Sequence, residues 1–128
     1  MSVGLVLEGG AMRGMYTAGV LDIFLDNDIK TDGIVGVSAG ALFGVNYASG
    51  QRGRVIRYNK KYAADKRYMG FQSWLRTGNI INCDFAYYEV PLSLDPFDDE
   101  AFQKSGIDYY ATVTNVETGR PEYIKVEN

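Results

Sequence analysis

An α/β fold, with a mainly parallel sheet covered by helices, is predicted by the order and length of the apolar segments. In the first 50 residues, short apolar runs at 3–7 and 34–37 alternate with longer segments of helical spacing at 12–25 and 39–48. The short connections between them favour parallel strands joined by right-handed crossovers. A chain of 128 residues is long enough for one domain with a single core.

The first strand and the first helix follow from their residue patterns. Residues 3–7 form an apolar run, which is typical of a strand buried on both faces, and Glu8-Gly9-Gly10 closes it with a turn. From 12 to 25 the sequence has the spacing of an amphipathic helix. Its apolar positions three to four residues apart include Ala18, Leu21 and Leu25.

The remaining elements are less uniform. Residues 34–37 read as a short buried strand, and the small and apolar residues 39–48 predict a helix packed closely on a sheet. A polar-faced helix is expected over 51–67, whereas 68–97 has no simple period and is expected to be a loop-rich insertion or cover. Finally, strands are predicted at 107–116 and 122–126, joined as a β-hairpin by the turn 117–120.

Composition and charge narrow the classes of protein. The content of 46% hydrophobic residues and the lack of a low-complexity tract argue against disorder. A net charge of −3 without a base-reading module argues against nucleic-acid binding. Residues 51–76 carry eight basic residues and one acidic residue, and 84–100 carry only acidic charges. Capping of a helix by Asp98 or Asp99 accounts for part of the acidic run. The single cysteine, Cys83, is expected in the core.

Ser38 is the candidate nucleophile of the chain. It lies in Gly36-Val37-Ser38-Ala39-Gly40, between a predicted strand and a predicted helix, which is the setting of a nucleophile elbow. Gly36 and Gly40 are expected because a Cβ at either place would strike the adjacent strand or helix. The N–H of Ala39, at the start of the helix, would face the negative charge that develops on an attacked carbonyl. The alternative is a structural turn in which Ser38 caps the helix.

A glycine-rich loop is expected at the same edge of the sheet. Residues 9–14 (Gly-Gly-Ala-Met-Arg-Gly) follow the first strand, and carboxyl ends of parallel strands share one edge. Successive N–H groups of this loop could hold an oxyanion, with Arg13 adding positive charge. Phosphate or nucleotide binding and a purely structural turn are the alternatives, although neither the P-loop nor the dinucleotide fingerprint matches in detail.

The base that would activate Ser38 cannot be histidine, because the sequence contains none. Lysine serves as the base in some hydrolases, but none lies within seven residues of Ser38 or in a Ser-x-x-Lys motif. A carboxylate could accept the serine proton directly if water were excluded.

The segments Glu8–Gly14 and Gly36–Ala41 resemble the opening of the patatin-like phospholipases. The resemblance covers residues 3–48 well, and 52–68 and 94–98 only loosely. It implies a three-layer α/β/α fold and a Ser-Asp dyad without histidine, which fits the missing histidine. Carried over by position, Ser38 is the nucleophile, and the oxyanion loop comprises Gly9, Gly10, Ala11, Arg13 and Gly14, with the Ala39 N–H.

Two positions depart from the family pattern. Ala11 stands where many members have glycine. The family's aspartate lies in a downstream Asp-Gly-Gly or Asp-Gly-Ala motif that is absent here, and Asp32-Gly33 precedes Ser38 on the same strand. The substitutes in this sequence are Asp84, Asp95 and Asp108. The expectation is therefore that 1–128 is the N-terminal portion of one patatin-like domain, incomplete in its sheet and inactive alone, with the dyad aspartate beyond Asn128.

The resemblance implies a serine acyl hydrolase acting on lipid or phospholipid esters, with no cofactor and no metal. The alternative is a non-catalytic phosphate- or lipid-binding module that uses the glycine-rich loop. Residues 52–76, which mix basic and aromatic side chains, are a candidate for peripheral contact with a membrane surface, the other interpretation being a solvated helix above a core. A cytoplasmic location is expected, and an exposed sheet edge or face predicts self-association.

Overall fold

The structure is a computed structural model that describes residues 2–126, and its described residues fall into two compact units. Unit 1 comprises residues 2–53 and 98–126, and unit 2 comprises residues 54–97. No helix among residues 2–126 combines the length and the apolar character needed to span a membrane.

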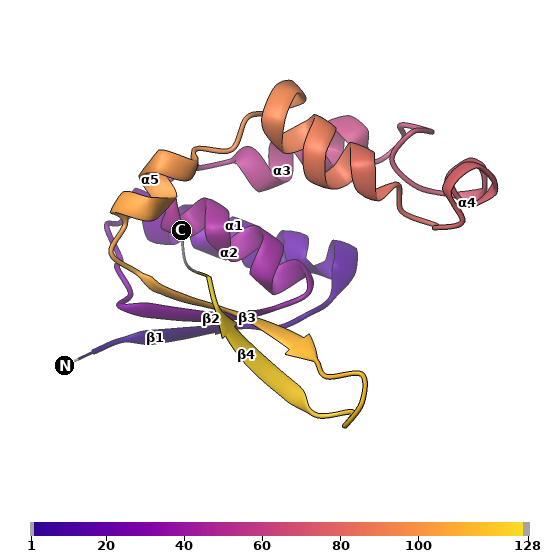
Figure 1. The fold of residues 1–128 in the computed structure, drawn as a ribbon. Coiled ribbons are helices and arrows are strands. Elements are labelled where there is room, and N and C mark those ends of the chain that lie inside the picture. Colours follow the sequence, from indigo (N-terminus) through magenta and orange to yellow (C-terminus); the bar gives the residue numbers. More distant parts are fainter. Residues whose placement is uncertain (1, 127–128) are drawn as a thin grey trace. The chain divides into compact units, whose positions relative to one another are not determined.

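Unit 1 is built on a four-stranded sheet in the order β1-β2-β3-β4 (Figure 1). Strands β1 (Gly4–Leu7), β2 (Gly33–Val37) and β3 (Asp108–Thr114) are parallel, and β4 (Pro121–Lys125) pairs antiparallel with β3. The α/β class, the mainly parallel sheet and the predicted hairpin are confirmed. In the hairpin turn, the Asn115 side chain accepts hydrogen bonds from the N–H groups of Glu117 and Thr118.

The helices of unit 1 lie on one face of the sheet (Figure 1). The 3₁₀ turn η1 (Ala11–Arg13) leads into α1 (Gly14–Asp26), while α2 (Ala39–Ala48) follows β2, and α5 (Asp99–Lys104) precedes β3. Both parallel connections step in the same direction along the sheet, so right-handed crossovers place their helices on the same side. Asp98 caps α5 by accepting from the Ala101 N–H at 2.9 Å, as predicted.

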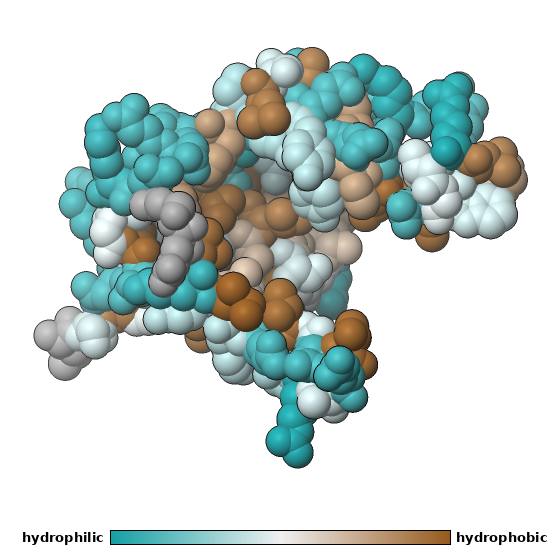
Figure 2. All heavy atoms as spheres, in the orientation of Figure 1, coloured by the Kyte–Doolittle hydropathy of each residue, from teal (hydrophilic) through white to brown (hydrophobic). Residues whose placement is uncertain are grey.

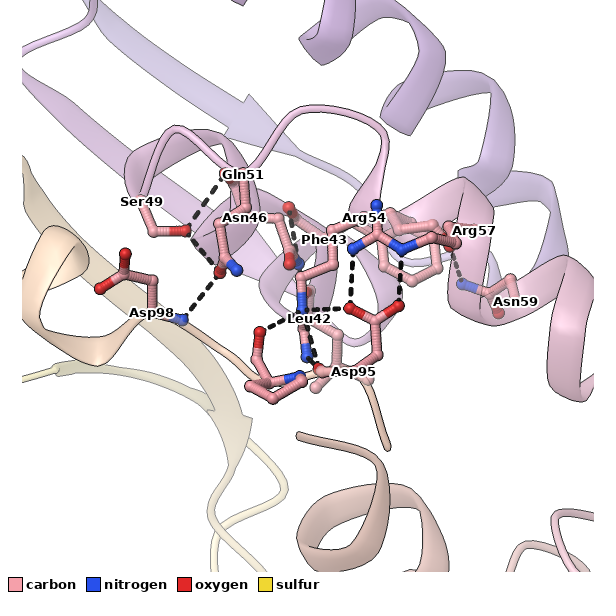
Figure 3. Close-up of polar contacts among 12 residues, drawn as sticks. Leu42, Phe43, Asn46, Ser49, Gln51, Arg54, Arg57, Asn59, Asp95 and Asp98 are labelled. Carbon is pink, nitrogen blue, oxygen red and sulfur yellow. Dashed lines mark hydrogen bonds and ion pairs between the residues drawn. The ribbon is translucent and has the colours of Figure 1, made fainter. Parts of the chain in front are cut away.

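The core of unit 1 lies between this helical layer and the sheet. Ile34 and Tyr109 are register partners on neighbouring strands and are almost fully buried. Helices contribute the other large buried side chains, including Leu21, Phe43, Tyr47 and Phe102. Gln51 joins two segments of the unit, because its side chain accepts from the Ser49 hydroxyl at 3.1 Å and from the Asp98 N–H at 3.0 Å (Figure 3).

The opposite face of the sheet carries no helix from the described part of unit 1. Val6, which alternation along β1 directs to this face, has 77% of its surface exposed, and Val37 and Tyr123 are also exposed. The second helical layer of an α/β/α sandwich is thus not supplied by the described residues of this unit. The exposed apolar residues are in keeping with the expectation of self-association, which stays a prediction.

Unit 2 contains more regular structure than its sequence suggests. It comprises α3 (Arg54–Tyr62), α4 (Phe71–Thr77) and the π-helix η2 (Phe85–Leu94). The predicted helix over 51–67 is therefore shorter, and the prediction of a loop-rich 68–97 is wrong. A π-helix turns with i→i+5 spacing, and Pro91 lies inside it, so no period of 3.6 marks the segment. Cys83 is exposed, so the prediction of a core position is also wrong.

The core of unit 2 combines aromatic packing with buried charge. Tyr62, Phe85 and Val90 form its centre, and the Tyr62 and Phe85 rings meet edge to face with centroids 5.5 Å apart. Asp95 accepts from both nitrogens of the Arg57 fork, at 2.8 and 2.7 Å, and lies 3.3 Å from the buried Arg54 Nε (Figure 3). Arg54 also donates to the backbone carbonyls of Asp95 and Pro96.

Candidate active site

Ser38 stands alone between the end of β2 and the start of α2, in a backbone conformation that L-residues rarely adopt. Its φ of 50° and ψ of −118° force a sharp turn, and its side chain is exposed. Residues held in such conformations cluster at functional sites because the surrounding structure has to enforce them. The hydroxyl makes no capping hydrogen bond to α2, so the alternative of Ser38 as a helix cap loses its physical basis.

Two glycines make this turn possible. A Cβ on Gly36 would lie 2.5 Å from the Ala41 Cα and 2.7 Å from its nitrogen, inside the first turn of α2. A Cβ on Gly40 would overlap the Leu7 carbonyl oxygen and lie 2.7 Å from that of Glu8 at the end of β1. Both obstacles are backbone, which cannot swing aside as a side chain does. The elbow is therefore clamped between β1 and α2.

The glycine-rich loop reaches the serine. A Cβ on Gly9 would lie 3.2 Å from the Ser38 Cβ and 3.3 Å from the Val37 carbonyl oxygen, so the bare backbone of the loop passes directly beside the elbow. Within residues 2–126, the N–H groups of Gly9 and Gly10 donate to no protein acceptor. They are available to an anionic group next to Ser38.

Ala11 and Arg13 complete the loop. Ala11 has a φ of 45°, which explains physically why glycine is favoured at this position. The Arg13 side chain folds back along the loop, with its Nη2 atom 3.7 Å from the place of a Cβ on Gly10. The Arg13 N–H also donates to the Gly10 carbonyl at 2.9 Å. Positive charge therefore accompanies the free N–H groups.

Gly14 is placed differently from the rest of the loop. It is the buried first residue of α1, where a Cβ would lie 2.7 Å from Phe43 Cε2 and 3.3 Å from the Ala39 Cβ. Its function in this geometry is to let α1 pack against the start of α2, not to face a ligand. This contact holds the glycine-rich loop and the elbow in a fixed relation.

The N-terminus of α2 supplies the second set of donors. Ala39 and Gly40 are the first two residues of the helix, and the leading N–H groups of a helix have no partner within it. The helix dipole adds partial positive charge at this end. The Ala39 N–H therefore lies next to Ser38 in the chain, at the partially positive end of α2.

Tyr109 contacts α2 just after the elbow, and the sequence did not predict it as part of the site. Its hydroxyl donates to the Ala41 carbonyl at 2.6 Å, and it approaches α2 closely only because position 44 is glycine, whose Cβ would lie 2.6 Å from that hydroxyl. Burial raises the pKa of the Tyr109 hydroxyl, which therefore stays protonated as a donor. Because Tyr109 lies 68 residues from Ala41, no local pattern could have revealed this contact.

Two of the aspartates predicted as possible bases are unsuited to that role: Asp108 lies far along its strand, and Asp95 is bound by arginine. Asp108 is opposite Gly33 in the sheet register, whereas Thr112 is opposite Val37, the residue before Ser38. Asp108 therefore lies at the other end of the strands, about 13 Å from Thr112 along β3. At that end Asp32 accepts from the Val3 N–H at 2.6 Å. In unit 2, the hydrogen bonds from Arg57 hold the pKa of Asp95 below its ordinary value. A carboxylate stabilised in this way is a poor proton acceptor.

Asp84, the third aspartate predicted as a possible base, is exposed and immediately precedes η2 in unit 2. In the part of the chain that the structure describes, no three His, Cys, Asp or Glu side chains are grouped so that they could hold a metal ion.

Known proteins resemble the chain over most of its length. Residues 5–109 match the family model of the patatin-like phospholipases. "Uncharacterized protein YjjU" of Escherichia coli (strain K12) is 32% identical over 98 residues, which are 73% of this chain and 28% of that protein. "Lysophospholipase nte1" is 29% identical in Aspergillus oryzae and 30% identical in Aspergillus terreus, in each case over 95% of this chain and 8% of the relative. The chain thus spans less than a third of the length of these relatives.

Proposed function

This chain belongs to the patatin-like phospholipase family, and from that premise we propose that the intact protein is a serine acyl hydrolase acting on lipid or phospholipid esters, with Ser38 as its nucleophile. The observation that carries the proposal is the exposed Ser38, strained at a φ of 50° and touching a loop of unengaged N–H groups. Two relatives are named lysophospholipases, which supports a lipid ester as the substrate class.

The first chemical step is acylation of Ser38. Its Oγ attacks the ester carbonyl carbon while its proton passes to a base, and the carbonyl π electrons move to the oxygen. The tetrahedral intermediate collapses as the C–O bond to the alcohol breaks, and the alcohol leaves with the proton from the protonated base. Water then attacks the acyl-enzyme by the same route and releases the carboxylic acid and free Ser38.

The oxyanion is held from two sides in this proposal. N–H groups of Gly9 and Gly10 donate from the loop, and the Ala39 N–H donates from the start of α2. Arg13 adds a positive charge close to Gly10. Such donors are already oriented before charge develops, so they stabilise the transition state without reorganisation.

The base is an aspartate that forms a dyad with Ser38, and we place it outside residues 2–126. The reason is that Asp108 lies at the wrong end of the strands, Asp95 is bound by arginine, and Asp84 is exposed to water, whereas direct proton transfer from serine requires that water is excluded. The 128-residue chain alone is accordingly expected to hydrolyse esters far more slowly than the intact protein. Equal turnover by the two would contradict a base outside the chain.

Hydrolysis of p-nitrophenyl butyrate by the intact protein tests the proposal. Ser38→Ala should lower kcat/KM by about 10³-fold or more, because the nucleophile is lost while binding remains. Ser93→Ala, at an exposed serine of η2, is the matched control and should leave kcat/KM unchanged. Turnover that survives Ser38→Ala would refute the nucleophile. Absence of turnover, with phosphate binding that Arg13→Ala abolishes, would favour a non-catalytic binding module.

A further inference from the structure

Residues 69–82 of unit 2 form a closed lobe around α4. An antiparallel bridge joins Met69 to Ile81, and two hydrogen bonds of 2.9 Å flank it, from the Gly70 N–H to the Ile80 carbonyl and from the Asn82 N–H to the Tyr68 carbonyl. Inside the lobe, the buried Ser73 donates its hydroxyl to the Asn79 carbonyl at 2.8 Å. The segment is thus a built structure, held by its own contacts.

Several large apolar side chains of this lobe are exposed. Phe71, Trp74 and Leu75 are spaced so that they share one side of α4, and their exposed fractions are 70%, 50% and 64%. Ile80, 68% exposed, lies beside them because its carbonyl binds the Gly70 N–H. Figure 2 shows brown, apolar side chains at the surface around α4. These four residues are called the lobe tip.

Basic residues lie in and just before the lobe. The segment 69–82 contains Arg76 and no acidic residue, and Lys66 lies just before it. Within residues 2–126, neither Arg76 nor Lys66 has a carboxylate partner, whereas Arg67 pairs with both Asp65 and Glu89. Arg76, which follows Leu75 on α4, and Lys66, three residues before the lobe, are therefore free to meet an external anion.

The nature of the side chains indicates what covers the tip. Trp74 and Phe71 form a ring pair with centroids 5.6 Å apart and planes tilted by 32°, which presents a broad aromatic surface. Tryptophan with neighbouring lysine and arginine is typical of the boundary between lipid headgroups and acyl chains. An anionic lipid surface would attract Arg76 and Lys66, which have no carboxylate partner among the described residues.

We propose that the lobe tip docks on an anionic lipid surface, with Phe71, Trp74, Leu75 and Ile80 entering the headgroup boundary and Arg76 and Lys66 contacting lipid phosphates. The inference rests on the proposed lipid substrate, because it brings the protein to the surface where that substrate resides. It also replaces the broad candidate region 52–76 with a defined lobe, residues 69–82, and the neighbouring Lys66.

Trp74 is the only tryptophan of the 128-residue sequence, so its fluorescence reports on the lobe tip directly. The Ser38→Ala chain, which lacks the proposed nucleophile, is titrated with vesicles of phosphatidylglycerol and phosphatidylcholine in equal amounts. The emission should shift to the blue, and acyl chains brominated near the headgroup should quench it. Unchanged emission, or a blue shift that appears with rising protein concentration in the absence of vesicles, would overturn the proposal, the latter because it indicates a second copy as the partner.

Variants separate the two parts of the docking surface. Phe71→Ser combined with Leu75→Ser should weaken vesicle binding at least about tenfold, because apolar burial is lost. Leu92→Ser, which removes a 72% exposed leucine outside the lobe, is the control and should bind like the parent chain. Arg76→Glu should weaken binding to these vesicles at low salt and have little effect at high salt, where charges are screened. Equal binding by all variants would contradict the docking surface.

The outcomes remain distinguishable from those of the proposed function. Vesicle binding is measured in a Ser38→Ala background and needs no chemistry. If Ser38 proves inert while Trp74 still enters vesicles, the hydrolase proposal fails and the docking proposal stands. If Ser38 reacts but Trp74 never changes its environment, only the docking proposal fails.

Discussion

At the scale of single residues, the candidate site contains backbone conformations that cost free energy relative to ordinary backbone. Ser38 in the elbow and Ala11 in the glycine-rich loop both have positive φ, at 50° and 45°. Each such residue costs about 1–3 kcal/mol relative to ordinary backbone. In return, the turn at Ser38 exposes its side chain beside the backbone of Gly9.

The strain at Ser38 can be measured by substitution. Ser38→Gly should raise the free energy of unfolding by about 1 kcal/mol, since glycine tolerates positive φ and this gain exceeds its greater entropy in the unfolded chain. Ser38→Ala keeps the strain and should change stability by less than about 0.5 kcal/mol. Urea denaturation at pH 7 measures both values. A glycine variant less stable than the alanine variant would show that Ser38 is not strained.

The site could be predicted from the sequence only where local patterns carry it. The motif at 36–40 indicates Ser38 and its flanking glycines because sterics demand small residues there. The burial of Gly14 could not be foreseen, because it depends on the Phe43 ring from another helix. The Tyr109 support is equally hidden, since it joins residues distant in sequence.

At the scale of elements, α2 and β1 hold the elbow through contacts with glycine backbone. Gly36→Ala or Gly40→Ala should lower the free energy of unfolding by about 3 kcal/mol or abolish folding, because each Cβ meets backbone atoms at 2.5–2.7 Å. The matched control is Gly19→Ala within α1, where a Cβ meets nothing within 4 Å.

Gly19→Ala should raise stability by about 0.5–1 kcal/mol, because alanine favours a helix and no atom opposes it. Thermal unfolding followed by circular dichroism compares the three variants. Equal effects at positions 19, 36 and 40 would mean that the elbow is not clamped sterically.

Elements with a regular period could be predicted, and others could not. The β-α-β-α order of the first 50 residues matches the structure closely, because each buried face repeats along the chain. In contrast, α4 spans seven residues and η2 turns with a π period, so neither produces a helical pattern in the sequence.

At the scale of the whole molecule, the chain is held by two separate cores. Unit 1 buries aliphatic and aromatic side chains between helices and sheet, and unit 2 includes the buried Asp95 with Arg54 and Arg57. Removing one member of a buried ion pair leaves an uncompensated charge. We therefore expect Asp95 to contribute to the stability of unit 2 and to the dependence of that stability on pH.

Asp95→Asn should lower the free energy of unfolding of unit 2 by about 3 kcal/mol at pH 7. The pKa of Asp95 is depressed in the folded chain by hydrogen bonds from Arg57, so its contribution is present above the unfolded pKa of about 3.9 and is lost as pH falls through the folded value. The difference between wild type and variant should accordingly shrink from pH 7 to pH 2.

Trp74 fluorescence during urea unfolding follows unit 2 specifically. Asp84→Asn, at an exposed aspartate that makes no cap hydrogen bond to η2, is the control and should stay within about 0.5 kcal/mol of wild type. A loss for Asp95→Asn that is the same at pH 7 and pH 2 would contradict the electrostatic origin of its contribution.

The central claim, that Ser38 is an activated nucleophile, is tested most directly by a fluorophosphonate probe on the intact protein, followed by peptide mapping with mass spectrometry. The probe phosphonylates an activated serine and loses fluoride, and it needs no knowledge of the natural substrate. The expected result is one adduct, on Ser38, that disappears in Ser38→Ala and persists in Ser93→Ala. An adduct on another residue, or no Ser38-dependent adduct in the folded intact protein, would contradict the account.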